Sequence, residues 1–369
     1  MATGLTAGDR SSLARTGVPS FSLVSSFRNL PMLPVVILAA ILLSLTVDGF
    51  SSVANAQNIM RQLSVILIAV SGETLVLLTG GIDLSIGAIV GLASVCGAYT
   101  MQATDSVLLG LLTCLAVGVA VGVINGIGIA VFGIQPFIMT FGTMLTVRAL
   151  AFLITGGRSV GRLPKVLLEG GRLDLFGIPL IFILGLCVCG IIGFMLTRTA
   201  FGQKIYLTGS NSRAARFSGI NVKRLTFVIY VLSGALAGLA AFVFMMRLGS
   251  ASPTAGDPLL LQIIGAVVLG GTTLTGGEGG ILRSVTGALL IAMIVKSLEI
   301  LGAQFWDQMI VIGVLTALGS ALGSWLSRRR TSGSARRTAA PLIFEDETVR
   351  PADPNAGHSR APPDSSRAG

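Results

Sequence analysis

The chain has 369 residues, of which 52% are hydrophobic and 11% charged, with 48 glycines and a mean hydropathy of +0.85. A soluble domain carries about 25% charged residues, so the composition excludes an ordinary soluble globule and predicts a polytopic membrane protein. The net charge is +10. Because most basic residues lie between and after apolar runs, without interleaved aromatic residues, they indicate loops beside anionic lipid rather than nucleic-acid binding.

Ten apolar runs are candidates for membrane-spanning helices, each of which needs about 20 residues. Several runs are short or contain glycine, so nine or eleven spans are alternatives. The sequence predicts an all-α polytopic membrane protein of about ten transmembrane helices, some of them Gly-interrupted. The ten runs lie at 31–48, 59–79, 84–103, 107–131, 136–155, 178–197, 225–247, 258–273, 283–302 and 305–326.

The basic residues predict how these runs are oriented, because short cytoplasmic loops are rich in Lys and Arg. The loop 198–224 carries six basic residues and no acidic one, and Arg328–Arg330 follow the last run. With ten spans, this loop and both termini lie in the cytoplasm. The segment 156–177 argues against this orientation, because it carries four basic residues on the predicted outer side.

The same reasoning divides the chain into three parts. Residues 1–30 lack a convincing signal peptide and are expected to form a cytoplasmic N-terminal segment. Residues 31–326 form the transmembrane domain. Residues 327–369 are polar and without periodicity, which predicts a disordered cytoplasmic tail.

One acidic residue stands within the glycine-containing apolar stretch Leu75–Ser94. Asp83 follows the pair Gly80 and Gly81. A carboxylate at membrane depth is costly and often marks a pathway, and irregular backbone there must be covered by protein or line a cavity. Asp83 is therefore either part of an interrupted helix beside a transport path or the cap of a helix that follows a short extramembrane loop.

A second glycine-rich stretch, GGTTLTGGEGG at 270–280, echoes TGGIDLSIG at 79–87. Each follows an apolar run and carries one acidic residue. Paired Gly-interrupted segments in two halves of a transporter point to its pathway. The alternative is coincidence, because small residues are common where membrane helices pack closely.

The sequence contains no motif for catalysis or for a bound cofactor. There is no GxxxxGK[ST] loop for ATP and no HExxH motif, the cysteine spacings do not suit zinc, and the only histidine is His358 in the tail. The charged residues within or beside the runs include Glu73, Glu299, Lys296 and Arg283. Acidic residues at such positions also serve proton- or sodium-driven carriers, so an ion-coupled secondary transporter is an alternative.

The cytoplasmic loop contains a predicted short helix over residues 211–216. Asn211 or Ser212 is a suitable N-cap, and Gly219 is a suitable stop. Such a helix either docks into another protein or lies on lipid headgroups through Arg213 and Arg216.

Three segments together resemble the permeases of ribose-type ATP-binding-cassette (ABC) importers. TGGIDLSIG at 79–87 is similar to the family signature, GQKIYLTGSNSRAARFSGINVKR at 202–224 resembles the family's coupling segment, and IGAVVLGGTTLTGGEGG at 264–280 is similar to its third landmark. The segments occur in family order, and the resemblance covers about residues 30–325.

The resemblance implies a subunit of the bacterial-type inner (plasma) membrane, without catalysis or a cofactor of its own, that forms the path for a monosaccharide or related polyol. It implies three partners: a second permease copy or a paralogue, a cytoplasmic ATPase that binds ATP, and an extracytoplasmic sugar-binding protein. A branched-chain amino acid permease of related architecture is the alternative within ABC transport.

The resemblance also assigns roles to residues. The implied pathway residues are Thr79, Gly80, Gly81, Asp83, Ser85, Gly270, Gly271 and Thr272, and the implied ATPase-coupling residues are Tyr206, Gly209, Asn211, Ala214, Ala215, Ser218 and Gly219.

Four positions depart from the family pattern: Arg283 and Ser284 after the third landmark, and Lys296 and Glu299 in the following run. The last two are three residues apart and share one helix face. They either line the path, which would favour an anionic or modified sugar or a sugar alcohol, or they pair with each other.

Overall fold

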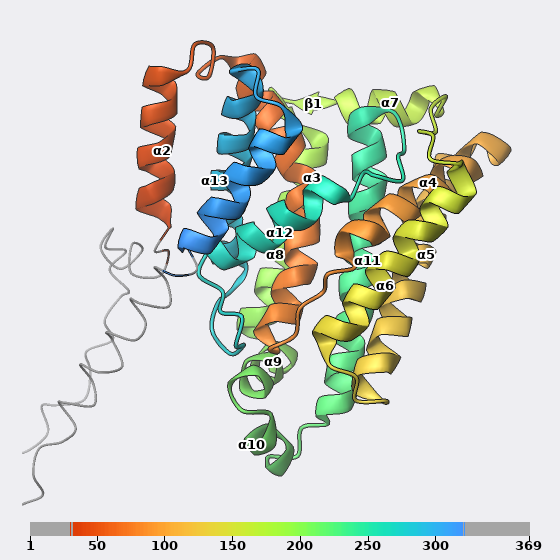
Figure 1. Ribbon diagram of the computed structural model, residues 1–369, viewed down its shortest axis with the longest axis vertical. Coiled ribbons are helices and arrows are strands. Elements are labelled where there is room, and N and C mark those ends of the chain that lie inside the picture. The colour runs from red at the N-terminus through yellow and green to blue at the C-terminus, as the bar shows by residue number, and fades with distance from the viewer. Residues whose placement is uncertain (1–29, 31, 320, 322–369) are drawn as a thin grey trace, which may run out of the picture. The chain divides into compact units, whose positions relative to one another are not determined.

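The computed structural model describes residues 30, 32–319 and 321, whose arrangement is shown in Figure 1. The predicted N-terminal segment 1–30, except for Leu30, lies outside these residues, as does the predicted tail 327–369. The end of the last predicted run, 305–326, is also outside them. The proposals for these parts of the chain therefore remain predictions.

The described chain is mostly helical, which confirms the predicted all-α class. A small hairpin pairs β1 (Asp174–Leu175) with β2 (Ile178–Pro179), with Asp174 opposite Pro179. The helices are α2 (Leu33–Thr46), α3 (Val53–Leu78), α4 (Ile86–Thr104), α5 (Val107–Ala130), α6 (Pro136–Thr155), α7 (Lys165–Arg172), α8 (Leu180–Arg198), α9 (Ala200–Ser210), α10 (Ser212–Phe217), α11 (Val222–Leu248), α12 (Asp257–Leu269), α13 (Ile281–Ile300) and a last helix, Phe305–Gly319.

Seven helices in the described residues are long and apolar enough to cross a membrane: α3, α4, α5, α6, α8, α11 and α13. The other three apolar helices, α2, α12 and Phe305–Gly319, have between 10 and 17 residues. At 1.5 Å per residue, α2, α12 and the described part of the last helix extend at most about 25 Å, against about 30 Å for the hydrocarbon core. Each predicted run therefore contains a helix, whereas ten complete crossings remain a prediction.

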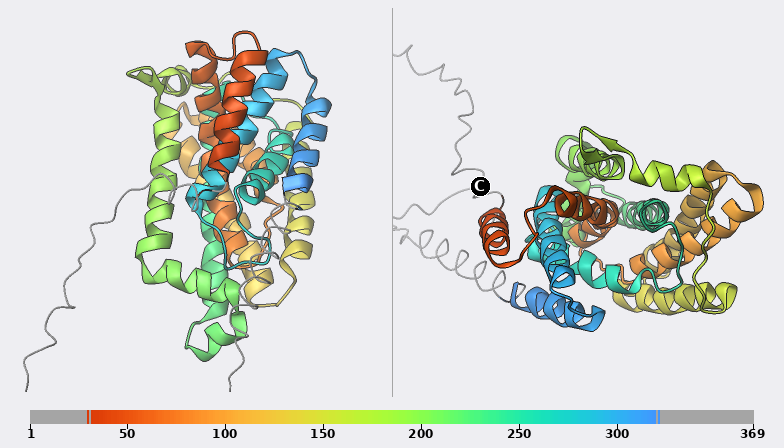
Figure 2. Two further views of the ribbon diagram at one scale, coloured as in Figure 1. Left: turned by 90° about the vertical axis from the view of Figure 1, so that its left-hand side faces the viewer. Right: turned by 90° about the horizontal axis from the view of Figure 1, so that it is seen from above.

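The core of the molecule surrounds α3. Every residue of this helix from Gln62 to Leu78 is buried, as expected for a helix that is apolar on all sides. In contrast, α2 lies at the edge of the helices when they are seen from above (Figure 2), and it exposes Val35, Leu38, Ile41 and Leu45. The segment that follows α3 is thus held at the centre of the protein.

Glycines bring α5 and α11 into close contact. A Cβ at Gly118 would overlap the carbonyl oxygen of Gly234, and one at Gly122 would stand 2.5 Å from that of Tyr230. Small residues allow this backbone approach between membrane helices. Asn125 of α5 and Ser233 of α11 thereby lie beside the segment that follows α3, where they bind Ser85 and Asp83.

Two opposite ends of the helices are distinguishable in Figures 1 and 2. The pair α9 and α10 lies at one end, here called the α10 end, and α7 with the β1–β2 hairpin lies at the other, the α7 end. Helix α8 connects the two ends. The segments 156–177 and 198–224 therefore lie at opposite ends, in agreement with their predicted placement on opposite sides of the membrane.

Candidate functional site

Asp83 lies in the segment 79–85, which joins the buried end of α3 to the start of α4. Its carboxylate accepts hydrogen bonds from the Ser85 backbone N–H at 3.0 Å, from the Ser85 hydroxyl at 2.5 Å and from the Ser233 hydroxyl of α11 at 3.2 Å. The backbone N–H of Asp83 donates to the Glu73 carboxylate at 3.3 Å. These bonds connect the segment to α3 and α11.

Two further side chains complete this buried polar cluster. The Asn125 amide of α5 donates to the Ser85 hydroxyl at 2.8 Å. The Tyr230 hydroxyl lies against Gly81, where an added Cβ would stand 2.6 Å from it. We call Glu73, Asp83, Ser85, Asn125, Tyr230 and Ser233 the Asp83 cluster. Four elements contribute to it, so it fixes the position of the segment 79–85.

The Asp83 cluster is closed to solvent. Asp83 is 1% exposed, and Glu73, Ser85 and Asn125 are fully buried. Helix α4 begins at Ile86 with Ser85 as its N-cap, and Asp83 binds the backbone N–H of that residue. Sequence reasoning missed Asn125, Tyr230 and Ser233, although they are polar residues within apolar runs.

The second glycine-rich segment begins where α12 ends. Gly270 packs against α13, because a Cβ there would overlap the Arg283 carbonyl oxygen, and Gly271 has a φ of 92°. Thr272 is buried, and its hydroxyl accepts from the Gly280 N–H at 3.3 Å. The segment 270–280 thus folds back on itself before α13 starts.

The two glycine-rich segments meet at the α10 end. The Gly277 N–H donates to the Leu78 carbonyl oxygen at 2.9 Å, directly before Thr79. Gly80, with a φ of 80°, is so close to the second segment that its Cβ would stand 3.3 Å from the Thr275 carbonyl oxygen. The internal echo noted in the sequence therefore corresponds to a direct contact.

Helix α9 joins this contact. A Cβ at Gly209 would overlap the Leu78 carbonyl oxygen and would stand 2.5 Å from the Gly277 nitrogen. The Tyr206 hydroxyl donates to the Gly279 carbonyl oxygen at 3.1 Å. We call the contact of Gly209 and Tyr206 with residues 78–80 and 275–279 the glycine junction. Two of the predicted coupling residues thus touch the segments that hold the predicted pathway residues.

Helix α10 matches the predicted short helix. The Asn211 side chain caps it by accepting from the backbone N–H groups of Arg213 and Ala214 at 3.1 and 3.0 Å, and Gly219 follows its end with a φ of 81°. Ala215 is buried within the chain. The other predicted coupling residues of this region, Asn211, Ala214, Ser218 and Gly219, are exposed.

The positions that depart from the family pattern have partners in the structure. Lys296 donates to the Glu299 carboxylate at 2.8 Å on α13, so these two residues pair with each other. The Arg283 guanidinium reaches the Gly271 carbonyl oxygen at 3.5 Å. No group of three or more metal-ligating side chains occurs in the part of the chain that the structure describes.

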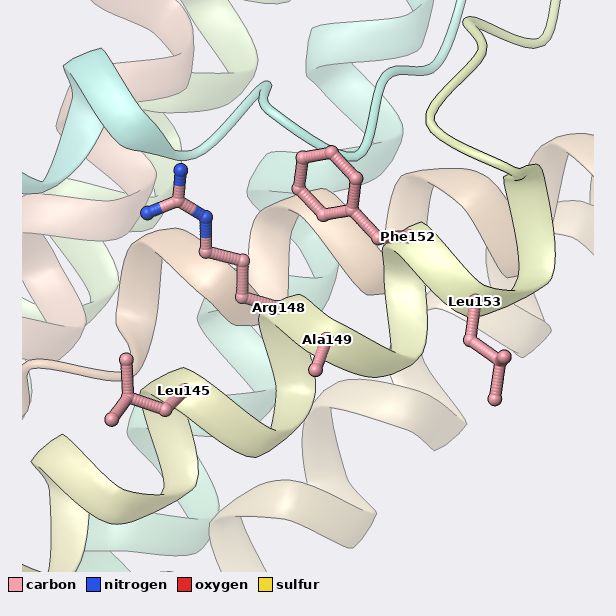
Figure 3. Close-up of a pocket in the computed structure, with 5 residues that line it drawn as sticks. All are labelled: Leu145, Arg148, Ala149, Phe152 and Leu153. Atoms are coloured by element: carbon pink, nitrogen blue, oxygen red, sulfur yellow. The ribbon is translucent and has the colours of Figure 1, made fainter.

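One pocket, shown in Figure 3, has a volume of about 600 Å³ and is lined by Leu145, Arg148, Ala149, Phe152 and Leu153 of α6. None of the predicted pathway residues lines it. Arg148 binds the Asp257 carboxylate of α12 at 2.8 Å. Sequence reasoning missed both residues, although Arg148 stands within an apolar run.

A model of the family described as "Branched-chain amino acid transport system / permease component" matches residues 55–319. The chain belongs to this family. It is a permease component rather than an enzyme, and a multi-pass protein of the inner membrane.

Several curated relatives cover most of the chain. The ribose import permease protein RbsC of Escherichia coli K12 is 37% identical over 78% of this chain and 90% of its own. The D-allose transport system permease protein AlsC of the same strain is 36% identical over 79% and 90%. The fructose import permease protein FrcC of Rhizobium meliloti is 33% identical over 80% and 84%. No solved structure matches the chain.

Proposed function

We propose that this chain is the transmembrane permease subunit of an ABC importer and forms the uptake pathway for a monosaccharide or a related polyol. One observation carries the proposal: permeases named for ribose, D-allose and fructose are 33–37% identical to it over at least 78% of its length. The chain then needs a separate ATPase, because it contains no loop that could cradle ATP phosphates.

The proposed topology has about ten transmembrane helices, some Gly-interrupted, with both termini in the cytoplasm. Residues 1–30 precede the permease domain 31–326, and 327–369 form a disordered tail. The basic loop 198–224 supports this orientation, because it places the α10 end in the cytoplasm. The α7 end then faces the sugar-binding protein, and a second copy or a paralogue completes the pathway.

We propose that the glycine-rich segments form the wall of the pathway at the α10 end. The residues concerned are Thr79, Gly80, Gly81, Asp83, Ser85, Gly270, Gly271 and Thr272. Their support is the glycine junction, where the backbones pack too closely for any side chain and where the wide φ/ψ range of glycine would allow a second backbone conformation once the packed segments separate. The Asp83 cluster is closed in this conformation, so Asp83 orients the wall rather than contacting sugar.

The proposed coupling route begins at α10 and passes through α9 to the glycine junction. The residues are Tyr206, Gly209, Asn211, Ala214, Ala215, Ser218 and Gly219. Tyr206 and Gly209 support the inner part of the route through their contacts. Phe217, which is 93% exposed on a helix with Arg213 and Arg216, supports docking of α10 into the ATPase, since an exposed aromatic residue is suited to anchor an interface.

The docking proposal has a matched control within the chain. Phe217→Asp is expected to weaken binding of the purified permease to its ATPase at least tenfold without reducing membrane insertion. Phe176 is 97% exposed at the α7 end, so Phe176→Asp is expected to leave that binding unchanged. Equal ATPase binding by both variants would contradict docking through α10.

A branched-chain amino acid permease is the second candidate, because the matching family model carries that description. Uptake into proteoliposomes that contain the chain and its cognate ATPase and binding protein separates the two. We expect uptake of at least one of D-ribose, D-allose and D-fructose, and none of L-leucine or L-valine. Uptake of an amino acid alone would favour the second candidate.

A further inference from the structure

Arg148 is an unusual residue for its place in α6. It lies twelve residues after Pro136 and seven before Thr155, which puts its backbone about 18 Å from one end of the helix and about 10 Å from the other. Its side chain is 45% exposed. Charged residues at such depth almost always face a bundle interior or a water-filled cavity rather than lipid. This face of α6 is therefore expected to meet water.

The partner of Arg148 also lies within the membrane. The segment before α12 starts near the α7 end, where Ala251 pairs with Val160, and it descends along α4 until Gly256 packs against Gly87. Gln102, at the other end of α4, binds the Gly161 carbonyl oxygen at the α7 end. Gly87 and Gln102 are fifteen residues apart, or about 22 Å along the helix.

Helix α12 consequently starts deep in the protein, as its position in Figure 1 also shows. It has 13 residues and carries Asp257 in its first turn. Asp257 is 32% exposed and accepts from Arg148 at 2.8 Å. Half-helices that start near the bilayer centre are typical of substrate sites in transporters.

An aromatic ring lies beside this ion pair. The Arg148 guanidinium carbon is 6.0 Å from the centre of the Phe152 ring, and both side chains extend from the same side of α6 in Figure 3. The pocket between them is lined by α6 alone. It is an open hollow whose borders include the exposed side chains of Leu145 and Leu153, so a second permease copy packed against α6 would cover it, as in the proposed pairing.

We propose that Arg148, Asp257 and Phe152 form a contact site for a neutral polyhydroxylated ligand in the translocation pathway; this rests on the proposed function. The remaining guanidinium N–H groups and carboxylate lone pairs can bind vicinal hydroxyl groups. The Phe152 ring can cover the apolar C–H face of a sugar. A neutral polyol can use these remaining donors and acceptors while the ion pair stays intact.

The site is tested by replacing the four natural cysteines and introducing Ala149→Cys, at an exposed position that lines the pocket without being one of the proposed contacts. In the complex with the ATPase and binding protein, a membrane-impermeant, water-borne thiol reagent is expected to modify the introduced cysteine. A transported sugar, tested as D-ribose, D-allose and D-fructose with their loaded binding protein, is expected to slow modification at least threefold. Leu38→Cys, from a 57% exposed position in the middle of α2, is the control and is expected to stay unmodified in lipid.

Uptake measurements complete the test. Arg148→Gln and Asp257→Asn are each expected to lower sugar uptake at least tenfold, while the complex still assembles. If the thiol introduced by Ala149→Cys is unreactive, or reacts equally fast with and without sugar, the inference is overturned, as it is by wild-type uptake in both Arg148→Gln and Asp257→Asn. Failure of the proposed function has a different signature, because the wild-type complex itself would then take up none of the three sugars.

Discussion

Two carboxylates, Asp83 and Asp257, both stand in or beside apolar runs, but their surroundings are opposite. Asp83 is 1% exposed, and its carboxylate is bound by Ser85 and Ser233. Asp257 is 32% exposed and binds one cation, Arg148, beside an open pocket. A buried and satisfied carboxylate holds a backbone in place, whereas an open one at membrane depth is available to a solute. Depth alone therefore does not identify a transport residue.

The largest expected effect is the loss of the Asp83 carboxylate. Asp83→Ala leaves the Ser85 N–H and the hydroxyls of Ser85 and Ser233 without their acceptor in a closed site. Because each unsatisfied buried group costs about 1–3 kcal/mol, the three together should cost at least about 3 kcal/mol. Asp257→Ala, at an exposed ion pair, should cost about 1 kcal/mol or less. Thermal unfolding of both variants in detergent measures the difference. If Asp83→Ala and Asp257→Ala lower the stability equally, Asp83 and Asp257 do not differ in their structural role.

An intermediate effect is expected at the glycine junction. Gly209→Ala places a methyl group against the Leu78 carbonyl oxygen and the Gly277 nitrogen, and the resulting shift should cost about 1–3 kcal/mol. It should also lower the amount of sugar transported per ATP hydrolysed, because α9 then moves away from the glycine-rich segments. Gly190→Ala on α8, with nothing within 4 Å of the new methyl, is the control. If Gly209→Ala transports as much sugar per ATP hydrolysed as the wild type, the glycine junction is not part of the coupling route.

The smallest effect is expected at the Lys296–Glu299 pair. It has the same length as the Arg148–Asp257 pair, 2.8 Å, but both of its residues lie on one helix. An i,i+3 pair contributes about 0.2–0.5 kcal/mol, so Lys296→Met combined with Glu299→Leu should leave stability and uptake nearly unchanged. A tenfold loss of uptake in this double variant would indicate that Lys296 and Glu299 line the pathway. It would then favour an anionic or modified substrate.

Features that depend on neighbouring residues were predicted from the sequence, whereas contacts between distant residues were not. Helix α10 was predicted because its cap, Asn211, and its stop, Gly219, lie within nine residues of each other. All ten apolar runs contain helices for the same reason, since hydropathy acts over neighbouring residues. The length of α12 was overestimated, because its glycine-rich end at residues 270–273 was counted as part of the run.

The contacts across the fold could not be predicted in this way. Whether Asp83 is closed or open depends on Ser233, which is 150 residues away. The Arg148–Asp257 pair joins residues 109 apart. A single sequence contains no signal for such pairings, although Arg148 within an apolar run and Asn125 within another were visible as polar exceptions.

The most direct test of the account is the energy source of uptake. Proteoliposomes should contain this chain with its cognate ATPase and binding protein, and uptake of D-ribose, D-allose and D-fructose should be measured with ATP, with an ion gradient, and with neither. The account predicts sugar uptake that requires ATP and both partner proteins. Gradient-driven uptake by this chain alone would contradict it and would favour an ion-coupled secondary transporter.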